Sequence, residues 1–188
     1  SFAKNHNIPP TQYAAVLQSE TAADIEELYR FYDSRRRQAN ALDFDDLLLK
    51  AVAVLAQNTG QRDYYSNWYR HILVDEYQDT NRPQYELLRL LTSTHQNLFV
   101  VGDEDQSIYK FRGADIQNIL RFEKDFPGSR IIKLEQNYRS TQNILRAAGA
   151  VVEHNLERKG KSLWTDNHAG DVITCHSSPN ARAEADWI

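Results

Sequence analysis

Apolar side chains recur three and four residues apart through the first part of the chain, as expected for amphipathic helices. This spacing predicts that residues 1–40 are helical, with one segment entered at Pro9–Thr11 and a second that Thr21 caps. A further helix is predicted to begin near Asp43 and to end at Asn58–Gly60, where the residues favour a turn. Nothing in this part of the chain requires a sheet.

The pattern changes after His71 to short apolar runs separated by helical patterns. The runs cover residues 72–74, 98–101 and 131–134, and the helical patterns cover residues 83–92 and 116–126. Strands that alternate with helices predict an α/β fold with a parallel sheet. A last long helix is predicted from an N-cap at Ser140, followed by a strand over residues 171–175 and the opening of another helix at residues 183–187.

Composition is that of an ordinary globular protein: 188 residues, 41% hydrophobic and 26% charged, with a formal net charge of -4. That balance excludes a basic field over the whole chain, so any nucleic-acid contact has to be local. Basic clusters at residues 35–37 and 158–161 are expected to be solvated surface. The single cysteine, Cys175, excludes an internal disulfide, agrees with a cytoplasmic protein and is expected to be structural. No stretch approaches the about 20 apolar residues of a membrane span.

Two adjacent acids, Asp75 and Glu76, follow the first apolar run. In open α/β sheets, ligands bind beyond the carboxyl ends of the strands. One acid at that place can hold Mg²⁺, and its neighbour can deprotonate an attacking water. We therefore predict Asp75 as the metal ligand and Glu76 as the base, against the simpler alternative of an acidic pair that opens a surface loop.

The other two apolar runs are also followed by polar and aromatic residues. Gln106 is uncharged and can sense a phosphate through hydrogen bonds. Tyr109, Phe111 and Arg112 interleave aromatic and basic side chains, a combination suited to single-stranded nucleic acid. After the third run, Tyr138 offers a flat face for a base and Arg139 offers a planar fork for phosphate oxygens. Each aromatic side chain taken alone is more typical of a core residue than of a stacking platform.

Three of these runs resemble the motifs II, III and IV of superfamily 1 helicases of the UvrD/Rep/PcrA type. They are VDEYQDTN at residues 74–81, VGDEDQSIYKFRGA at residues 101–114 and LEQNYRST at residues 134–141. LDFDDL at residues 42–47 resembles the acidic and aromatic element that precedes motif II, and KSLWT at residues 161–165 resembles the segment after motif IV. The similarity covers nearly the whole chain and is weakest in its first 35 residues.

The resemblance implies an ATP site with Mg²⁺ as cofactor. Asp75 would hold the metal and Glu76 would activate water, while Gln106 would couple the γ-phosphate to the DNA site. Tyr138 would stack on adenine, and Arg139 would contact the γ-phosphate from a second motor domain. Catalysis would then depend on Glu76, Gln106 and Arg139.

The resemblance also implies a DNA site. Tyr109 and Phe111 would stack on the bases of single-stranded DNA, with Arg112 beside them. Motif III of close relatives usually has Trp where this chain has Phe111, so the stacking face is smaller but retained.

One element of such motors is absent from the sequence. A Gly-rich loop ending in Gly-Lys-Thr/Ser cradles the phosphates in these enzymes, and none of the 7 glycines here belongs to one. The resemblance places that loop before this region and further motifs after it. We therefore expect the middle of a motor with a partial RecA-like sheet. Residues 1–40 would be the tail of an inserted helical subdomain, residues 41–128 the later part of the first RecA-like domain, and residues 129–188 the start of the second.

The expected activity is that of an ATP-dependent helicase that moves 3′ to 5′ on single-stranded DNA and separates duplex DNA in repair or replication. The isolated chain is expected to lack ATPase activity and to form dimers or exchange strands through exposed sheet edges. Two alternatives remain: a non-catalytic module that binds DNA or protein, and a metal-dependent phosphohydrolase built on Asp75, Asp103 and Asp105.

Overall fold

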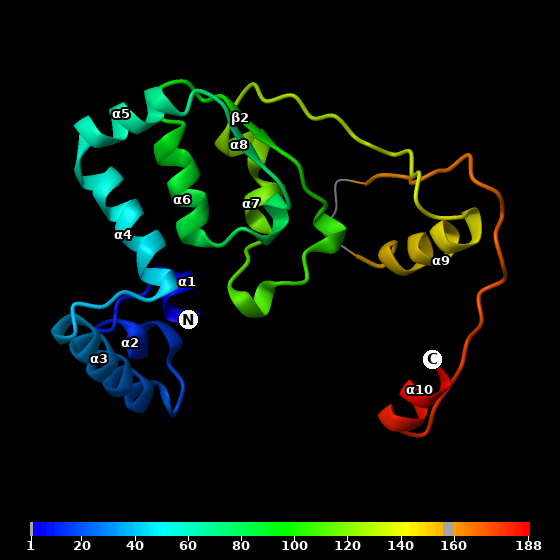
Figure 1. Ribbon diagram of the computed structural model, residues 1–188, viewed down its shortest axis with the longest axis horizontal. Helices are drawn as coiled ribbons and strands as arrows, with labels where there is room; N and C mark the ends of the chain where they lie inside the picture. Colours follow the sequence, from blue (N-terminus) through cyan, green and yellow to red (C-terminus); the bar gives the residue numbers. More distant parts are fainter. Residues whose placement is uncertain (1, 156–159) are drawn as a thin grey trace. The chain divides into compact units, whose positions relative to one another are not determined.

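The computed structural model describes residues 2–155 and 160–188 of the chain. It divides into two compact units, the first ending at Ser129 and the second beginning at Arg130. Figure 1 follows the chain in colour from α1 (Phe2–Asn5) at the N-terminus to α10 (Ala181–Trp187) near the C-terminus. Most of the basic cluster expected at residues 158–161 lies outside the described residues.

The first forty residues are helical, as the apolar spacing predicts. They form α1, α2 (Tyr13–Leu17) and α3 (Ala22–Gln38). Thr21 stands at the start of α3 but its side chain makes no cap bond, because its backbone is helical, with φ -94 and ψ 0. A capping side chain needs the extended backbone that turns it back toward the first turn, so the predicted cap at Thr21 is wrong.

The helix predicted from Asp43 is confirmed as α4 (Phe44–Gln57), and a reciprocal cap starts it. The Asp43 carboxylate accepts from the backbone N–H of Asp46 at 2.9 Å, and the Asp46 carboxylate accepts from the N–H of Asp43 at 3.1 Å. The turn predicted at Asn58–Gly60 is instead the start of α5 (Thr59–Trp68), because the Asn58 side chain accepts from Gln61 N at 3.0 Å and caps it. The same residues that favour a turn therefore begin a second helix.

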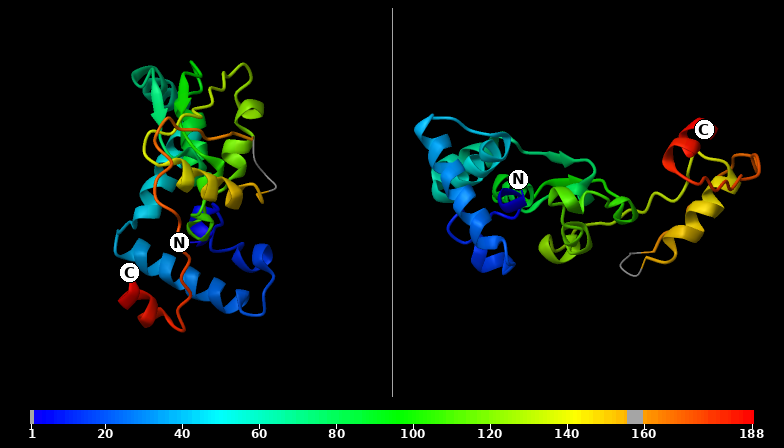
Figure 2. Two further views of the ribbon diagram at one scale, coloured as in Figure 1. Left: turned by 90° about the vertical axis from the view of Figure 1, so that its right-hand side faces the viewer. Right: turned by 90° about the horizontal axis from the view of Figure 1, so that it is seen from below.

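The predicted parallel pairing is confirmed for the first two apolar runs. They form β1 (Ile72–Val74) and β2 (Leu98–Val100), paired in parallel with Ile72 opposite Leu98. Between them the chain returns through α6 (Arg82–Leu91), whose reciprocal cap joins Asn81 and Gln84. The two arrows lie side by side in the left view of Figure 2. This strand–helix–strand connection sets both strand ends at the same edge.

After β2 the first unit closes with short turns. They are η2 (Glu104–Gln106), η3 (Lys110–Arg112), α7 (Gln117–Leu120) and α8 (Phe122–Asp125), and η1 (Tyr77–Asp79) follows β1 in the same way. The single helix predicted over residues 116–126 is broken at Arg121, where φ is -94 and ψ is 5.

The second unit contains α9 (Gln142–Val152) and α10, but the two strands predicted there are wrong. Residues 131–134 and 171–175 form no strand, and the described part of this unit has one parallel bridge, between Gln136 and Trp164. A strand exists only through a hydrogen-bonded partner, and apolar runs alone do not supply one. The cap of α9 is also misassigned, because Thr141 rather than Ser140 occupies the N-cap position. Cys175, expected to be structural, is exposed.

The core of the first unit includes Tyr77, which lies just after β1 in the chain. Tyr77 is 0% exposed and its ring meets Phe122 edge to face, with centroids 5.6 Å apart. On the strands, the alternate residues Leu73 and Phe99 are 73% and 59% exposed. One face of the two-stranded sheet is therefore open, while the residues of the other face, Ile72, Val74, Leu98 and Val100, are half-buried.

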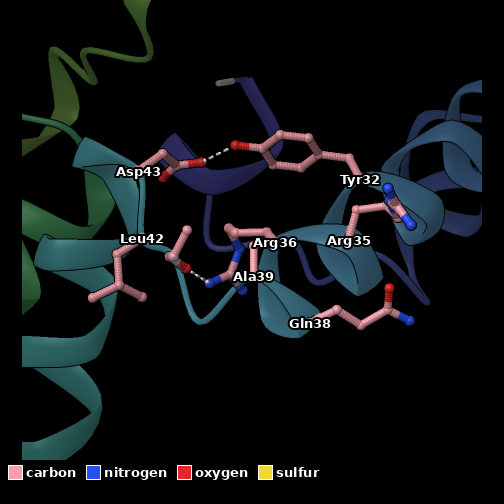
Figure 3. Close-up of a pocket in the computed structure, with 8 residues that line it drawn as sticks. Tyr32, Arg35, Arg36, Gln38, Ala39, Leu42 and Asp43 are labelled. Atoms are coloured by element: carbon pink, nitrogen blue, oxygen red, sulfur yellow. Dashed lines mark hydrogen bonds between the residues drawn. The ribbon is translucent and has the colours of Figure 1, made fainter.

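A network of ion pairs attaches the N-terminal helices to α4. The buried Lys4 ammonium contacts the carboxylates of Asp43 and Asp46, the latter at 2.9 Å. Arg36 of α3 forms an ion pair with Asp46 at 3.0 Å. The phenol of Tyr32 donates to Asp43 at 2.7 Å, as Figure 3 shows. Every charge in this group has an opposite neighbour, which is the condition under which buried charges are tolerated.

Beside this network a pocket of about 560 Å³ opens between the end of α3 and the start of α4 (Figure 3). None of the residues that line it is a predicted site residue, so its position does not support a role in nucleotide binding. Within the described residues, no helix has both the length and the apolar character needed to span a membrane.

Burial alone raises the pKa of Asp43, but hydrogen bonds from Lys4, Tyr32 and the backbone of Asp46 outweigh burial and hold that pKa well below its ordinary value of 3.8. A lowered folded-state pKa adds stability above the ordinary value, and that stability is lost as the pH falls toward the folded-state pKa. We expect Asp43→Asn to lower the free energy of unfolding by about 1–2 kcal/mol at neutral pH. Urea unfolding followed by circular dichroism should show this loss shrinking below the ordinary carboxyl pKa. Asp45→Asn, in the same first turn, is the control, and a loss that does not change with pH would contradict the assignment.

Candidate functional site

The two strand ends meet through hydrogen bonds that extend the parallel pairing. Beyond the paired strands, the N–H of Val101 donates to the carbonyl of Val74 at 2.8 Å, and the N–H of Tyr77 donates to the carbonyl of Val101 at 3.0 Å. The segments that follow β1 and β2 are thereby held against each other. This places the predicted acids and the start of the run VGDEDQSIYKFRGA at one edge of the sheet.

Asp75 and Glu76 stand at that edge with exposed side chains. The Asp75 carboxylate accepts from the backbone N–H of Glu76 at 2.9 Å. Glu76 has a left-handed backbone, with φ 49 and ψ 44, which L-residues other than Gly rarely adopt. The reversal turns the chain sharply after Asp75, and each carboxylate has a partner of its own: the Glu76 N–H for Asp75 and the Gln78 amide for Glu76. Strained backbone of this kind concentrates at functional sites, where the surrounding structure maintains it.

The buried Gln78 side chain joins the segments that follow the two strands. It is 1% exposed, its amide nitrogen donates to a Glu76 carboxylate oxygen at 2.8 Å, and its amide oxygen accepts from Asp103 N at 3.0 Å. A Cβ on Gly102 would come within 2.8 Å of that amide oxygen. A residue larger than glycine at position 102 would therefore have to displace the Gln78 amide and the end of Ile119. In the sequence, Gln78 is one residue of the run VDEYQDTN, and no local pattern in that run indicates this bridge.

Gln106 lies on the η2 turn, which begins at Asp103. The Asp103 carboxylate accepts from the N–H of Asp105 at 3.0 Å and from the side-chain amide of Gln106 at 2.8 Å. Gln106 is therefore brought to the same edge as Asp75 and Glu76, and its amide is held by a carboxylate there. An exchange of this acceptor for a phosphate oxygen would keep the same hydrogen-bond chemistry.

Charge is concentrated around these acids. Burial, and after it the negative charge of Glu76, raises the pKa of Asp79 above its ordinary value. One Asp79 carboxylate oxygen is buried without a hydrogen bond within the described part of the chain. A cation placed near this edge would offset both the repulsion and the burial. Asp75 suits a divalent ion of this kind, because a carboxylate with one bond to an N–H has acceptor capacity left.

Tyr109, Phe111 and Arg112 form one cluster around the η3 turn, which we call the aromatic–arginine cluster. The two ring centroids are 6.0 Å apart, and the Arg112 guanidinium lies 5.2 Å from the Tyr109 centroid and 5.5 Å from that of Phe111. Phe111 is 76% exposed and Tyr109 is 37% exposed. Open ring faces beside a fixed positive charge suit the bases and phosphates of a single strand.

Buried side chains attach the aromatic–arginine cluster to the run VDEYQDTN at residues 74–81. Thr80 accepts from Asp115 N at 3.0 Å through its carbonyl, and the Asn118 amide donates to the same carbonyl at 3.0 Å. From the N-terminal helix, Asn5 donates to the carbonyl of Arg112 at 2.8 Å. Sequence reasoning missed Asn5, Thr80 and Asn118, and no local signal reveals Asn5, which lies 107 residues from its partner.

Tyr138 and Arg139 belong to the second unit, in a turn organised by Asn137. The Asn137 side chain accepts from the backbone N–H of Arg139 at 2.9 Å and of Ser140 at 2.8 Å. The Tyr138 hydroxyl donates to Gln136 at 2.7 Å, and its ring is 78% exposed. Both predicted side chains are therefore presented on an ordered turn. Their convergence with the first unit on one nucleotide stays a prediction.

The sequence matches the N-terminal domain of UvrD/REP helicases over residues 1–127 and the UvrD-like helicase C-terminal domain over residues 132–188. The chain belongs to the UvrD/REP helicase family. It is 49% identical over 164 residues to the ATP-dependent DNA helicase PcrA of Staphylococcus epidermidis, covering 87% of this chain and 22% of that relative. With the ATP-dependent DNA helicase UvrD1 of Mycobacterium tuberculosis the identity is 49%, covering 98% of this chain and 25% of the relative. With PcrA of Bacillus subtilis it is 43%, covering 100% and 25%.

This UvrD/REP-family chain thus spans a quarter or less of the length of these curated relatives. The two matched regions are consecutive, one ending at residue 127 and the other beginning at residue 132. The compact units of the structure change over nearby, between Ser129 and Arg130.

The alternative three-acid metal site finds no support in the geometry. No group of three or more His, Cys, Asp or Glu side chains within residues 2–155 and 160–188 is arranged to hold a metal ion. The Asp103 carboxylate instead receives the N–H of Asp105 and the amide of Gln106. Asp75, Asp103 and Asp105 therefore do not act as a ligand set in this structure.

The left-handed backbone of Glu76 leads to a stability prediction. A left-handed residue other than Gly costs about 1–2 kcal/mol, and glycine avoids this cost. We expect Glu76→Gly to raise the free energy of unfolding by about 1 kcal/mol relative to Glu76→Ala. Urea unfolding of the two variants measures the difference. Equal stability, or a less stable glycine variant, would show that this backbone carries no strain.

Proposed function

We propose that this chain is a segment of an ATP-dependent DNA helicase that moves 3′ to 5′ along single-stranded DNA and separates duplex DNA in repair or replication. The observation that carries the proposal is the connection, within one compact unit, between an acid pair at a strand end and the exposed aromatic–arginine cluster. The family's relatives named above are ATP-dependent DNA helicases. We place the protein in the cytoplasm.

In this proposal the acids perform the hydrolysis. Asp75 holds Mg²⁺, which offsets negative charge on the phosphates. Glu76 accepts a proton from the attacking water, and the Gln78 amide bound to its carboxylate holds it in place for that task. Gln106 leaves Asp103 to donate to the γ-phosphate. From the second motor domain, Tyr138 stacks on adenine and Arg139 contacts the γ-phosphate.

The aromatic–arginine cluster is the proposed DNA site. Phe111 and Tyr109 stack on successive bases, and Arg112 faces the backbone phosphates. Thr80, in the same run as the acid pair, is hydrogen-bonded to Asn118, which follows the cluster in the chain. A movement at the acid pair is therefore transmitted to the cluster. ATP binding and release would in this way shift the bases along the strand.

The proposed domain division follows the family resemblance. Residues 1–40 are the tail of an inserted helical subdomain, residues 41–128 the later part of the first RecA-like domain, and residues 129–188 the start of the second. The open strand residues Leu73 and Phe99 support the further proposal that the isolated chain associates with itself.

The proposal is tested by steady-state ATP hydrolysis with Mg²⁺ and single-stranded DNA. The full-length protein that contains this segment should hydrolyse ATP, and Glu76→Gln should lower the rate by at least about 100-fold, because the water loses its base. The isolated 188 residues, which include no Gly-rich phosphate loop, should show no turnover above their own Glu76→Gln control. Turnover in the full-length protein that is unaffected by Glu76→Gln would refute the assigned chemistry.

DNA binding by the cluster is tested separately with a labelled oligothymidine strand and fluorescence anisotropy, in the absence of nucleotide. Phe111→Ala in the full-length protein should weaken binding by roughly 5- to 100-fold, the loss of about 1–3 kcal/mol of base stacking. Phe31→Ala, which removes a ring that is 65% exposed on α3, is the matched control and should leave affinity unchanged. Equal effects of the two substitutions would exclude a stacking role for Phe111.

A further inference from the structure

The buried amide of Gln78 has two polar contacts whose directions are unambiguous. Its NH₂ group donates to Glu76 Oε2 at 2.8 Å, and its oxygen accepts from the backbone N–H of Asp103 at 3.0 Å. An ionised carboxylate only accepts and a peptide N–H only donates, so the amide fits in one orientation. Gln78 is therefore hydrogen-bonded to the segments that follow both strands.

The hydrogen-bonded connection continues through Asp103 to Gln106. The Asp103 carboxylate accepts from the Gln106 amide at 2.8 Å, so Glu76, Gln78, Asp103 and Gln106 form one hydrogen-bonded series. A second attachment runs in parallel, because the Ser107 hydroxyl donates to the carbonyl of Gln78 at 3.4 Å. The proposed base and the proposed phosphate sensor are thus joined through the buried Gln78 side chain and through Asp103.

Little free space surrounds this side chain. Gln78 is 1% exposed, and a Cβ on Gly102 would lie 2.8 Å from its amide oxygen and 2.9 Å from Ile119 Cδ1. Buried polar groups keep their hydrogen bonds because leaving one unsatisfied costs about 1–3 kcal/mol. Both hydrogen bonds of the amide are therefore expected to be kept in the folded protein.

We propose that Gln78 is a positioning residue that sets the Glu76 carboxylate and makes the placement of Gln106 depend on it. The proposal rests on the hydrolytic function proposed above. When Glu76 takes the proton from water, its bond to Gln78 changes from one to a charged acceptor to one to a neutral acceptor, which is about half as strong. The change is passed through Asp103 to Gln106, and so links the chemical step to the segment that carries the aromatic–arginine cluster.

The test is Gln78→Leu in the full-length protein, which keeps a similar side-chain volume and removes both hydrogen bonds. We expect kcat for ATP hydrolysis at saturating single-stranded DNA to fall about 100-fold, the scale of a misplaced catalytic group. KM for ATP should change by less than about 3-fold, because the phosphate grip is elsewhere. The ratio of the rates with and without DNA should fall toward one.

Gly102→Ala is the second variant, because it leaves the Gln78 amide chemically intact and takes its space. It should reproduce the fall in kcat and in DNA stimulation, and combining it with Gln78→Leu should lower kcat by less than the product of the two single effects. Thr92→Val is the matched control. It removes a hydroxyl from a residue that is 2% exposed in the same unit, and it should leave kcat unchanged.

The outcomes separate this inference from the proposed function. If Glu76→Gln abolishes hydrolysis while Gln78→Leu keeps kcat and DNA stimulation within about 2-fold, Gln78 has no positioning role although the hydrolytic function stands. If Thr92→Val lowers kcat as much as Gln78→Leu does, the effect is one of general stability and the inference is wrong. If Glu76→Gln leaves hydrolysis intact, the proposed function and the inference both fail.

Discussion

The parallel pairing of β1 and β2 is the constraint on which the site depends. Three residue pairs, from Ile72–Leu98 to Val74–Val100, align the strands, and two further backbone bonds carry the alignment past their ends. Because parallel strands end at the same edge, acids and amides that lie more than twenty residues apart in the chain become neighbours there. The short loops after each strand then need only fold back for their side chains to meet.

Polar side chains take over where the backbone pairing ends. Gln78 joins Glu76 to Asp103, while Thr80 and Asn118 join the first motif to the segment around η3. These groups are buried and hydrogen-bonded, so displacing any of them leaves a polar atom without a partner. Hydrogen bonds are directional and apolar contacts are not, so such groups fix the positions of two loops relative to each other more strictly than apolar packing does.

The family relationship explains which features of the chain stand apart from a general α/β protein. Exposed aromatic rings beside an arginine suit the stacking of bases, and the left-handed Glu76 has a backbone that L-residues rarely adopt. Both occur in the motifs that carry the resemblance to UvrD/REP helicases. The ion-pair network around Lys4 and Asp43 has a different character, since it satisfies its own charges and connects α1, α3 and α4.

The amino-acid sequence by itself determined the family, the first two strands, the helices α4 and α6, and the residue types of the candidate site. Those features follow from local patterns: apolar spacing, a capping pair such as Asp43 and Asp46, and acids directly after an apolar run. It did not determine whether residues 131–134 and 171–175 become strands, because strand formation needs a partner that no local pattern supplies. It gave no sign of α5, whose first residues favour a turn until Asn58 caps them. Only the tertiary structure decided the backbone reversal at Glu76, the bridge through Gln78 and the attachment of Asn5 to Arg112. Each of these is a contact or conformation imposed by residues distant in the chain, and its energy exists only once the fold has brought them together.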